Sequence, residues 1–426
     1  MSVANAAVGP STAIASVRQL AIDLARRGHQ RESLELCRAE LRTEDGEKWL
    51  SARIIEAMTA ADLTLAGNLA AILAALQRGS EWYPPRDPGE WPPTLPRIPD
   101  AQLSTSKLLH DLAQLMHLRE AGVLGEAFDD VIRGYETTLG RLAGLDVNMR
   151  AALEPADEER IGRAFGRIVH LASAPRVAKA LSPSWDRTEA ERLYREHHPS
   201  IVVIDDFLTP DALESVYRFC LESTVWFGNR YANGRLGAFF FSGFNCPLLL
   251  QIAEEIRQDL PSLIGDTHPL RQLWGFKNTG HLPADSTIHA DFAAVNVNFW
   301  ISPTEGNLDP ASGGMLVYDV DAPAGWDFNT YNERIDLIRD FLDARNARAI
   351  RIPYRRNRAI IFNSDLFHAT EAVSFRPDYR SHRVNITMLY GDRQFDQHHP
   401  PQSSADPASP GPFNAWRSRA FTRFRR

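Results

Sequence analysis

Three side chains that can bind a metal ion, His289, Asp291 and His368, stand where buried strands are expected. His289 and Asp291 lie two residues apart at the start of an apolar run, and residues i and i+2 of a strand point to the same side. His368 follows a second apolar run, residues 359–362, through a polar turn. Two histidines and one carboxylate on one face of a metal leave positions open, which suits non-haem Fe(II). A His-x-Asp pair alone is common by chance, so this interpretation needs all three residues.

A candidate anion-binding residue, Arg383, opens the next expected strand, on which Arg383, Asn385 and Thr387 share one face. A guanidinium inside a barrel is costly unless it meets an anion, and a carboxylate bound through two hydrogen bonds is its best partner. The distal carboxylate of 2-oxoglutarate would be such a partner. Asn298 is expected either to face the same site or to be an ordinary hydrogen-bonded strand residue.

The elements that must position these residues begin near residue 199. The stretch "IVVIDDFLTPDALESVYRFC" predicts a short strand and then a helix with Thr209 as its N-cap. After residue 238, short runs rich in Val, Ile and Phe alternate with turn signals, as in "GAFFFSGF", "AVNVNFWISP", "GGMLVYD" and "RVNITMLYG". Regularly spaced short strands predict an antiparallel sandwich or barrel, in which buried Val295, Val297 and Phe299 would fix the metal ligands.

Residues 199–395 resemble the 2-oxoglutarate- and Fe(II)-dependent dioxygenases, in particular their prolyl-hydroxylase and phytanoyl-hydroxylase branches. The resemblance is carried by "IVVIDDFLTPDAL", by "SGGMLVYD" and by "IPYRRNRAIIFNSDLFHATEAV", in this order. It implies a double-stranded β-helix, or jelly roll. It also implies that His289, Asp291 and His368 bind iron, and that Arg383, or else Arg380, binds the C5 carboxylate of 2-oxoglutarate.

The activity that the resemblance implies is that of an oxidoreductase with Fe(II) as cofactor and 2-oxoglutarate and O2 as cosubstrates. Halogenating relatives lack the carboxylate ligand, so Asp291 favours hydroxylation. The tyrosine that some prolyl hydroxylases carry has no match in "WGFKNTGHLPADSTIH", which puts prolyl substrates in doubt. Two alternatives stay open: a cupin-type metalloenzyme that does not use 2-oxoglutarate, and a non-catalytic partner-binding protein with a degenerate barrel. The presence of both Asp291 and Arg383 speaks against the second.

The N-terminal half is expected to be helical, so the fold class is α+β and multidomain. Residues 11–80 predict helical hairpins that resemble tetratricopeptide-type repeats, with a plain bundle as an equal alternative. Residues 81–100 are proline-rich and predict a linker, and residues 101–190 return to a helical pattern. His110 and His117 in that region are expected to be packing or surface residues. Residues 396–426 predict a flexible basic tail.

Composition limits the classes of protein that the chain can belong to. Its 426 residues predict two or three domains, and 44% hydrophobic with 24% charged residues is typical of a soluble globular protein. The net charge of −7 argues against a nucleic-acid binder. Three scattered cysteines favour a reduced compartment. With neither a signal peptide nor an apolar span expected, we predict a cytoplasmic protein that does not enter a membrane.

The substrate class is indicated by two features. Repeat-like helices present grooves, which favours a peptide, protein or carrier-bound substrate over a free small molecule, although homodimerisation through the helices is a competing interpretation. An insertion, "DAPAGWDFNTYNERIDLIRDFLDARNA", contains Trp326, Phe328 and Tyr331 and then a predicted helix capped by Thr330 or Asn329. We expect these aromatic residues to attach the insertion to the barrel rather than to contact the substrate.

Overall fold

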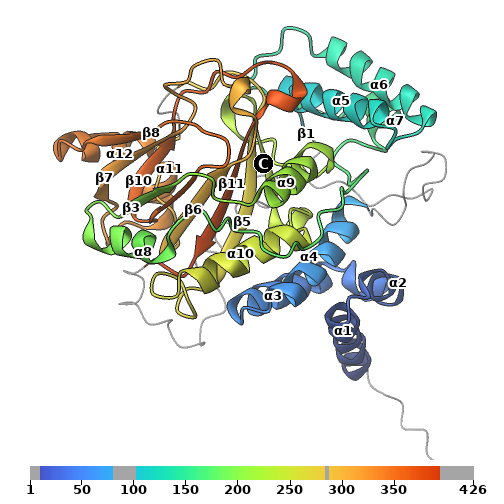
Figure 1. The fold of residues 1–426 in the computed structure, drawn as a ribbon. Coiled ribbons are helices and arrows are strands. Elements are labelled where there is room, and N and C mark those ends of the chain that lie inside the picture. The colour runs from blue at the N-terminus through green and yellow to red at the C-terminus, as the bar shows by residue number, and fades with distance from the viewer. Residues whose placement is uncertain (1–9, 80–101, 284–286, 394–426) are drawn as a thin grey trace, which may run out of the picture.

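The computed structural model describes residues 10–79, 102–283 and 287–393 and consists of helices around two larger antiparallel sheets (Figure 1). The helices that precede the first long strand are α1 (Pro10–Arg26), α2 (Gln30–Leu41), α3 (Glu44–Thr59), α4 (Leu63–Arg78), α5 (Thr105–Glu120), α6 (Asp129–Arg141), α7 (Pro155–Ile161) and α8 (Arg187–Glu196). Two short strands between them, β1 (Gln102–Leu103) and β2 (Ala151–Ala152), pair with each other. The later helices are α9 (Pro210–Glu222), α10 (Pro247–Asp259), α11 (Phe328–Glu333) and α12 (Ile335–Ala344).

The larger sheet contains six strands in the order β3 (Ile201–Ile204), β9 (Ala359–Asn363), β6 (Val295–Trp300), β11 (Arg383–Tyr390), β5 (Leu270–Asn278) and β4 (Arg235–Phe239). The smaller sheet contains β10 (Leu366–Thr370), β7 (Met315–Asp321) and β8 (Ala349–Ile352). An apolar cluster with members from both sheets, including Trp300, Val317 and Phe362, packs the two sheets face to face. The prediction of an α+β chain with antiparallel sheets is confirmed.

The six-stranded sheet has two faces of different chemistry because side chains alternate along each strand. Val295, Val297 and Phe299 belong to the apolar core that the sheet shares with the helices α4, α9 and α10. Asn296 and Asn298 therefore point to the inner face, toward the smaller sheet. The expectation that the three apolar residues would fix the metal ligands directly is wrong, because the strand period places them on the opposite face.

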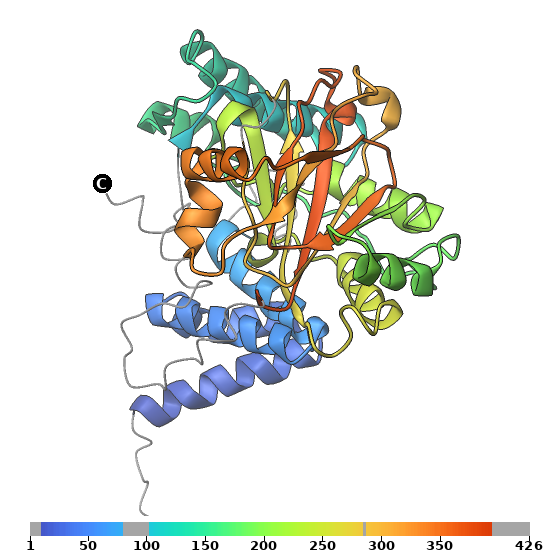
Figure 2. The same ribbon diagram turned by 90° about the vertical axis from the view of Figure 1, so that its left-hand side faces the viewer.

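The N-terminal helices pack as the pairs α1–α2 and α3–α4, and α4 lies in the core behind the six-stranded sheet. A Cβ atom at Gly67 would lie 2.6 Å from the Leu250 side chain, so α4 and α10 approach closely because this residue is glycine. Figure 2 shows α1–α4 (blue) and α5–α7 (teal) at different ends of the molecule. The likeness to tetratricopeptide repeats is not confirmed.

Two predicted segments, the linker at 81–100 and the tail at 396–426, lie outside the described residues. Of the helices in the described ranges, none combines the length and the apolar character needed to cross a lipid bilayer.

A buried polar network attaches α5 to the outer face of the sheet. Lys277 on β5 places its Nζ atom 3.1 Å from His110 Nε2, 3.2 Å from the Tyr379 hydroxyl and 3.2 Å from the Cys220 carbonyl oxygen. His110 Nδ1 in turn lies 3.0 Å from the Asp111 carboxylate. His110 is therefore a packing residue with hydrogen-bond partners. Burial lowers the pKa of Lys277 to about 7.

Replacing Lys277 with methionine should flatten the pH dependence of stability. The lysine pKa is about 7 in the folded protein and near its ordinary value of 10.5 in the unfolded chain. Between pH 7 and 9 the unfolded chain therefore binds more protons, and this group raises the free energy of unfolding by roughly 1 kcal/mol per pH unit. Urea denaturation at both pH values measures the slope. Lys179→Met, at an exposed lysine, is the control and should keep the wild-type slope; an unchanged slope in Lys277→Met would contradict the prediction.

Candidate metal centre

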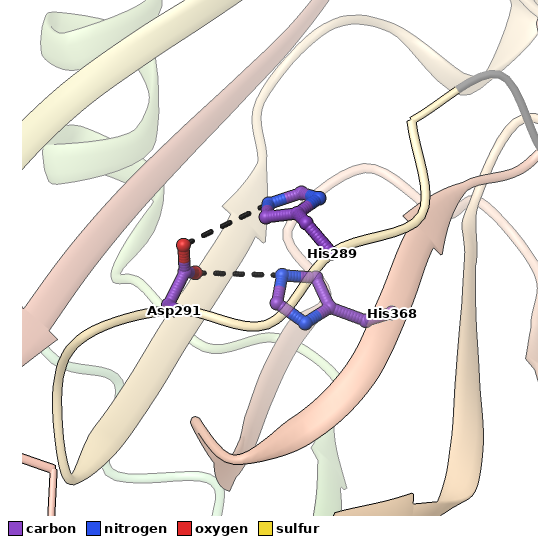
Figure 3. A group of neighbouring side chains, drawn as sticks. All are labelled: His289, Asp291 and His368. Carbon is purple, nitrogen blue, oxygen red and sulfur yellow. Dashed lines mark ion pairs between the residues drawn. The ribbon is translucent and has the colours of Figure 1, made fainter. Parts of the chain in front are cut away.

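The backbone joins His289 and His368 directly. The His289 N–H donates to the His368 carbonyl at 3.0 Å, and the His368 N–H donates to the His289 carbonyl at 2.8 Å. His368 lies in β10, whereas His289 precedes β6, so this bridge attaches the segment before β6 to the smaller sheet. The two imidazole rings consequently lie side by side, with centroids 4.4 Å apart (Figure 3).

Asp291 completes a group of three ligands. One carboxylate oxygen lies 3.7 Å from His289 Nε2 and the other lies 3.4 Å from His368 Nε2 (Figure 3). All three potential ligand atoms lie within 4.8 Å of one another, so one ion can contact all of them. We expected His289 and Asp291 at the start of a strand. Instead β6 begins at Val295, because residues 290–294 cross from the smaller sheet to the larger one.

The hydrogen bonds of the two imidazoles define which nitrogen atoms carry protons. His289 Nδ1 lies 2.5 Å from the Thr287 carbonyl oxygen, and His368 Nδ1 lies 3.0 Å from the Leu366 carbonyl oxygen. A carbonyl only accepts, so each Nδ1 carries a proton, and in the neutral form of each ring Nε2 is the nitrogen with the lone pair. In that form two lone pairs and a carboxylate converge, and this arrangement favours a bound cation.

The electrostatics of the group are also those of a metal site. Burial, with a smaller contribution from His368, lowers the pKa of His289 to about 4, so this ring is neutral at pH 7. Burial opposes ionisation of Asp291, but the neighbouring histidines and the Asn296 amide hold the pKa of this carboxyl below its ordinary value. Neutral imidazole and ionised carboxylate are the forms that bind metal ions.

A chain of buried amides runs from the ligands along the inner face. Asn296 donates to Asp291 Oδ2 at 2.5 Å, Asn298 donates to Asn296 Oδ1 at 2.6 Å, and Asn385 donates to Asn298 Oδ1 at 2.9 Å. Asn296, which orients Asp291, was not among the residues predicted from the sequence. Its signal was the alternation of asparagine and valine in "NVNFW", which marks one face of the strand.

Arg383 lies on the inner face of the same sheet and is buried. It donates through Nε to the Gly313 carbonyl at 2.5 Å, through Nη2 to the Gly314 carbonyl at 3.2 Å and through Nη1 to Asn278 Oδ1 at 3.4 Å. The Asn278 amide nitrogen and the Trp300 indole nitrogen are buried and have no hydrogen-bond partner among the described residues. Because burial lowers the pKa of Arg383 only to about 10, the guanidinium is charged at pH 7.

The glycine pair in "SGGMLVYD" explains why two carbonyl groups reach Arg383. Gly313 has a φ of +79°, in the left-handed region that glycine adopts without strain. A Cβ atom at Gly314 would lie 1.8 Å from the Ile352 carbonyl oxygen, so no other residue fits against β8 there. These two glycines therefore shape the turn whose carbonyl oxygens hold the guanidinium.

The two candidate arginines lie in different environments. Arg383 faces inward, whereas Arg380 is exposed on the short 3-10 helix Tyr379–Ser381. The Arg380 carbonyl accepts a hydrogen bond from the Tyr217 hydroxyl at 2.6 Å, which holds its backbone at the surface. Arg383 is thus the candidate that can reach a ligand between the sheets.

The insertion packs against the segments that carry the histidines. Tyr331 is buried in a cluster with Ile288 and Phe367, the neighbours of His289 and His368 in the chain, and its carbonyl accepts from the Ala290 N–H at 2.9 Å. Trp326 packs on Phe367 with centroids 6.0 Å apart. The aromatic residues therefore do attach the insertion to the barrel. The predicted helix is α12, and its N-cap is Arg334, not Thr330 or Asn329. Those two residues lie inside the separate short helix α11, which is capped by Asp327 through the Thr330 N–H.

Comparison with known proteins gives weak likenesses only. No family model and no curated protein matches the chain. Among solved structures, the non-heme alpha ketoglutarate dependent carbocyclase SnoK from nogalamycin biosynthesis aligns at 14% identity over 55% of this chain and 98% of its own, with a TM-score of 0.36. A Pseudomonas putida prolyl-4-hydroxylase aligns at 12% identity over 49% and 100%, with a TM-score of 0.31. Scores below 0.5 do not establish a common fold.

Removing either imidazole should abolish tight metal binding. We expect His289→Ala and His368→Ala to weaken Mn(II) binding roughly 100-fold or more, since loss of a residue that merely supports a ligand costs 10- to 100-fold. Isothermal titration measures the affinity, and thermal denaturation checks folding. His29→Ala, at an exposed histidine on the N-terminal helices, is the matched control. Unchanged affinity in both ligand variants would show that the three residues do not form a metal site.

Proposed function

We propose that this protein is an Fe(II)- and 2-oxoglutarate-dependent dioxygenase that hydroxylates an unactivated C–H bond. The ligand set supports iron: two imidazoles and one carboxylate would occupy one face of an ion and leave other positions for a chelating cosubstrate and O2. The observation that carries the proposal is the position of this group beside the inner face of the six-stranded sheet, the face that also carries Arg383. The amides of Asn296, Asn298 and Asn385 extend from Asp291 along that face.

The residues around Arg383 fit the distal carboxylate of 2-oxoglutarate. Buried donors are normally satisfied, and each unsatisfied one costs about 1–3 kcal/mol. The Asn278 and Trp300 nitrogens lack partners in the described part of the chain, and the Arg383 guanidinium lies 5.5 Å from the Trp300 ring. A carboxylate between them would accept from both donors and pair with the guanidinium. The proposed cosubstrate would thus offset the cost of burying three groups: the Asn278 nitrogen, the Trp300 nitrogen and the Arg383 guanidinium.

The chemistry that bound iron and 2-oxoglutarate supply is a balanced oxidation. 2-Oxoglutarate, O2 and R–H give succinate, CO2 and R–OH, with one oxygen atom entering succinate and the other entering the product. The protein's own residues have positioning roles. The Thr287 and Leu366 carbonyls keep both Nε2 lone pairs on the metal side, Asn296 holds the Asp291 carboxylate, and Arg383 sets the position of the cosubstrate.

The substrate class that we propose is a peptide, a protein or a carrier-bound molecule. The faces of α3 and α4 that pack into the core are not available to bind it. The feature that supports a macromolecular partner is exposed apolar surface on α1 and α2, where Ile14, Leu20 and Leu36 are accessible. A second copy of the chain at this surface is the competing proposal, which analytical ultracentrifugation distinguishes.

Arg383→Gln should raise the Kd for 2-oxoglutarate at least tenfold, because loss of a buried charged hydrogen bond costs about 1.5–3 kcal/mol. Titration of the Fe(II)-loaded protein under anaerobic conditions, followed by metal-to-ligand charge-transfer absorption, measures this Kd. Arg380→Gln is the matched control and should leave it unchanged. With O2 present, succinate formation reports turnover, and mass spectrometry of candidate peptides shows a gain of one oxygen atom.

The result that would contradict the proposal is a protein that binds Fe(II) but shows no change on addition of 2-oxoglutarate. That outcome would favour a metalloenzyme that works without this cosubstrate. An Arg380→Gln variant that loses affinity while Arg383→Gln keeps it would instead reverse the assignment of the two arginines.

A further inference from the structure

A second arginine, Arg235, faces the same side of the sheet as Arg383. Arg235 on β4 pairs with Asn278 on β5, and Asn278 pairs with Arg383 on β11. Residues directly opposite each other on adjacent strands project to the same face, so the three side chains form one row across the inner face. The flanking Leu236 belongs to the apolar core on the outer face, as the alternation requires.

The Arg235 guanidinium packs against an aromatic ring, and no acidic side chain among the described residues forms an ion pair with it. Its central carbon lies 3.7 Å from the centroid of Phe276 and 5.7 Å from that of Tyr231. Its Nε atom is buried and has no hydrogen-bond partner in residues 10–79, 102–283 and 287–393. The carboxylate whose charge reaches it is Asp291, a proposed metal ligand, and burial lowers the pKa of Arg235 only to about 10. It is therefore charged at neutral pH, and no carboxylate in the part of the chain that the structure describes forms an ion pair with it.

The charges of the proposed site leave Arg235 unbalanced. A divalent iron ion, the Asp291 carboxylate, the two carboxylates of 2-oxoglutarate and the Arg383 guanidinium sum to zero. Glu371, whose charge raises the pKa of Arg383, already forms an ion pair with Arg351. Arg235 then adds one positive charge that no acidic side chain of the described residues balances, and an anion is the best partner for such a guanidinium.

We propose that Arg235 binds an anionic oxygen group, a carboxylate or a phosphate, on the molecule that is oxidised. This inference rests on the proposed function and narrows its substrate class to acidic molecules. Acidic peptides and carrier-attached acids share this chemistry.

The position of Arg235 favours the oxidised substrate over 2-oxoglutarate as its ligand. Arg383 and Asn278 are buried, whereas Arg235 is partly exposed on the edge strand β4 and so lies where an incoming molecule can reach it. Its charge lowers the pKa of His289 as well as that of Arg383, which places it within electrostatic reach of both the metal ligands and the proposed cosubstrate anchor.

The surroundings of Arg235 indicate the rest of the substrate. Phe276 contacts Tyr231, Phe239 and Trp274 with ring centroids 5.1, 6.4 and 6.1 Å apart. Tyr231, Phe239 and Trp274 are partly exposed, so the guanidinium stands among aromatic rings that solvent reaches. An anionic group attached to an apolar body matches this combination.

Acetate, the simplest carboxylate, tests the proposal on the full chain loaded with Mn(II) and saturating 2-oxoglutarate. We expect acetate to raise the melting temperature of the wild type saturably, above the effect of sodium chloride at equal ionic strength and of neutral acetamide. Arg235→Gln should remove this difference, Arg235→Lys should keep part of it, and Arg380→Gln should keep all of it. An equal acetate response in the wild type and Arg235→Gln, including no response in either, overturns the proposal.

Titration with 2-oxoglutarate distinguishes whether Arg235 binds a carboxylate of the oxidised substrate or a carboxylate of 2-oxoglutarate. If Arg235 holds the oxidised substrate, Arg235→Gln raises the Kd for 2-oxoglutarate by less than Arg383→Gln does. An equal or larger increase means that Arg235 holds the cosubstrate and overturns the inference. A wild type that does not bind 2-oxoglutarate overturns the proposed function, whereas a wild type that binds it but fails the acetate comparison overturns only the role of Arg235.

Discussion

The paired backbone hydrogen bonds between His289 and His368 are the constraint on which the site depends. They bring together two chain segments from different sheets and place both imidazoles on one side of the bridge. Each ring then needs only one further hydrogen bond, from Nδ1 to a carbonyl two residues earlier in the chain, to direct its Nε2 atom at Asp291. Ligand geometry is thus set by backbone contacts, which are less mobile than contacts between side chains.

The two faces of the six-stranded sheet have different roles in the protein. The outer face packs apolar side chains such as Val297 and Ile386 against α4, α9 and α10 and supplies much of the buried apolar surface. The inner face carries asparagines and arginines that an ordinary core would exclude, among them Asn296, Asn298 and Arg383. Because side chains alternate along a strand, the same strand contributes apolar residues to the core on one face and polar residues to the candidate site on the other.

Local pattern and residue type were enough to predict antiparallel sheets. They also selected three candidate ligands, which the fold brings together, and Arg383, which the fold places on the inner face. The sequence could not predict features that depend on pairing between strands far apart in the chain. The role of Asn296 requires that residues 290–294 cross between the sheets, and the alignment of Arg235 with Arg383 requires the register of β4, β5 and β11. The apolar run at Val295–Phe299 showed a buried strand, but its period alone did not tell which face would meet the ligands.

The helical half of the chain has a physical role that does not depend on the identity of the substrate. The buried donors at Asn278 and Trp300, which have no hydrogen-bond partner within the part of the chain that the structure describes, and the charge on Arg235 all reduce stability, the donors by about 1–3 kcal/mol each. A sheet with such an inner face needs compensation elsewhere. The α3–α4 pair adds residues such as Leu69, Ile72 and Leu73, all fully buried, to the core behind the sheet. Burial of this kind contributes about 1.5–3 kcal/mol per large apolar side chain, which is enough to offset the cost of keeping the opposite face polar.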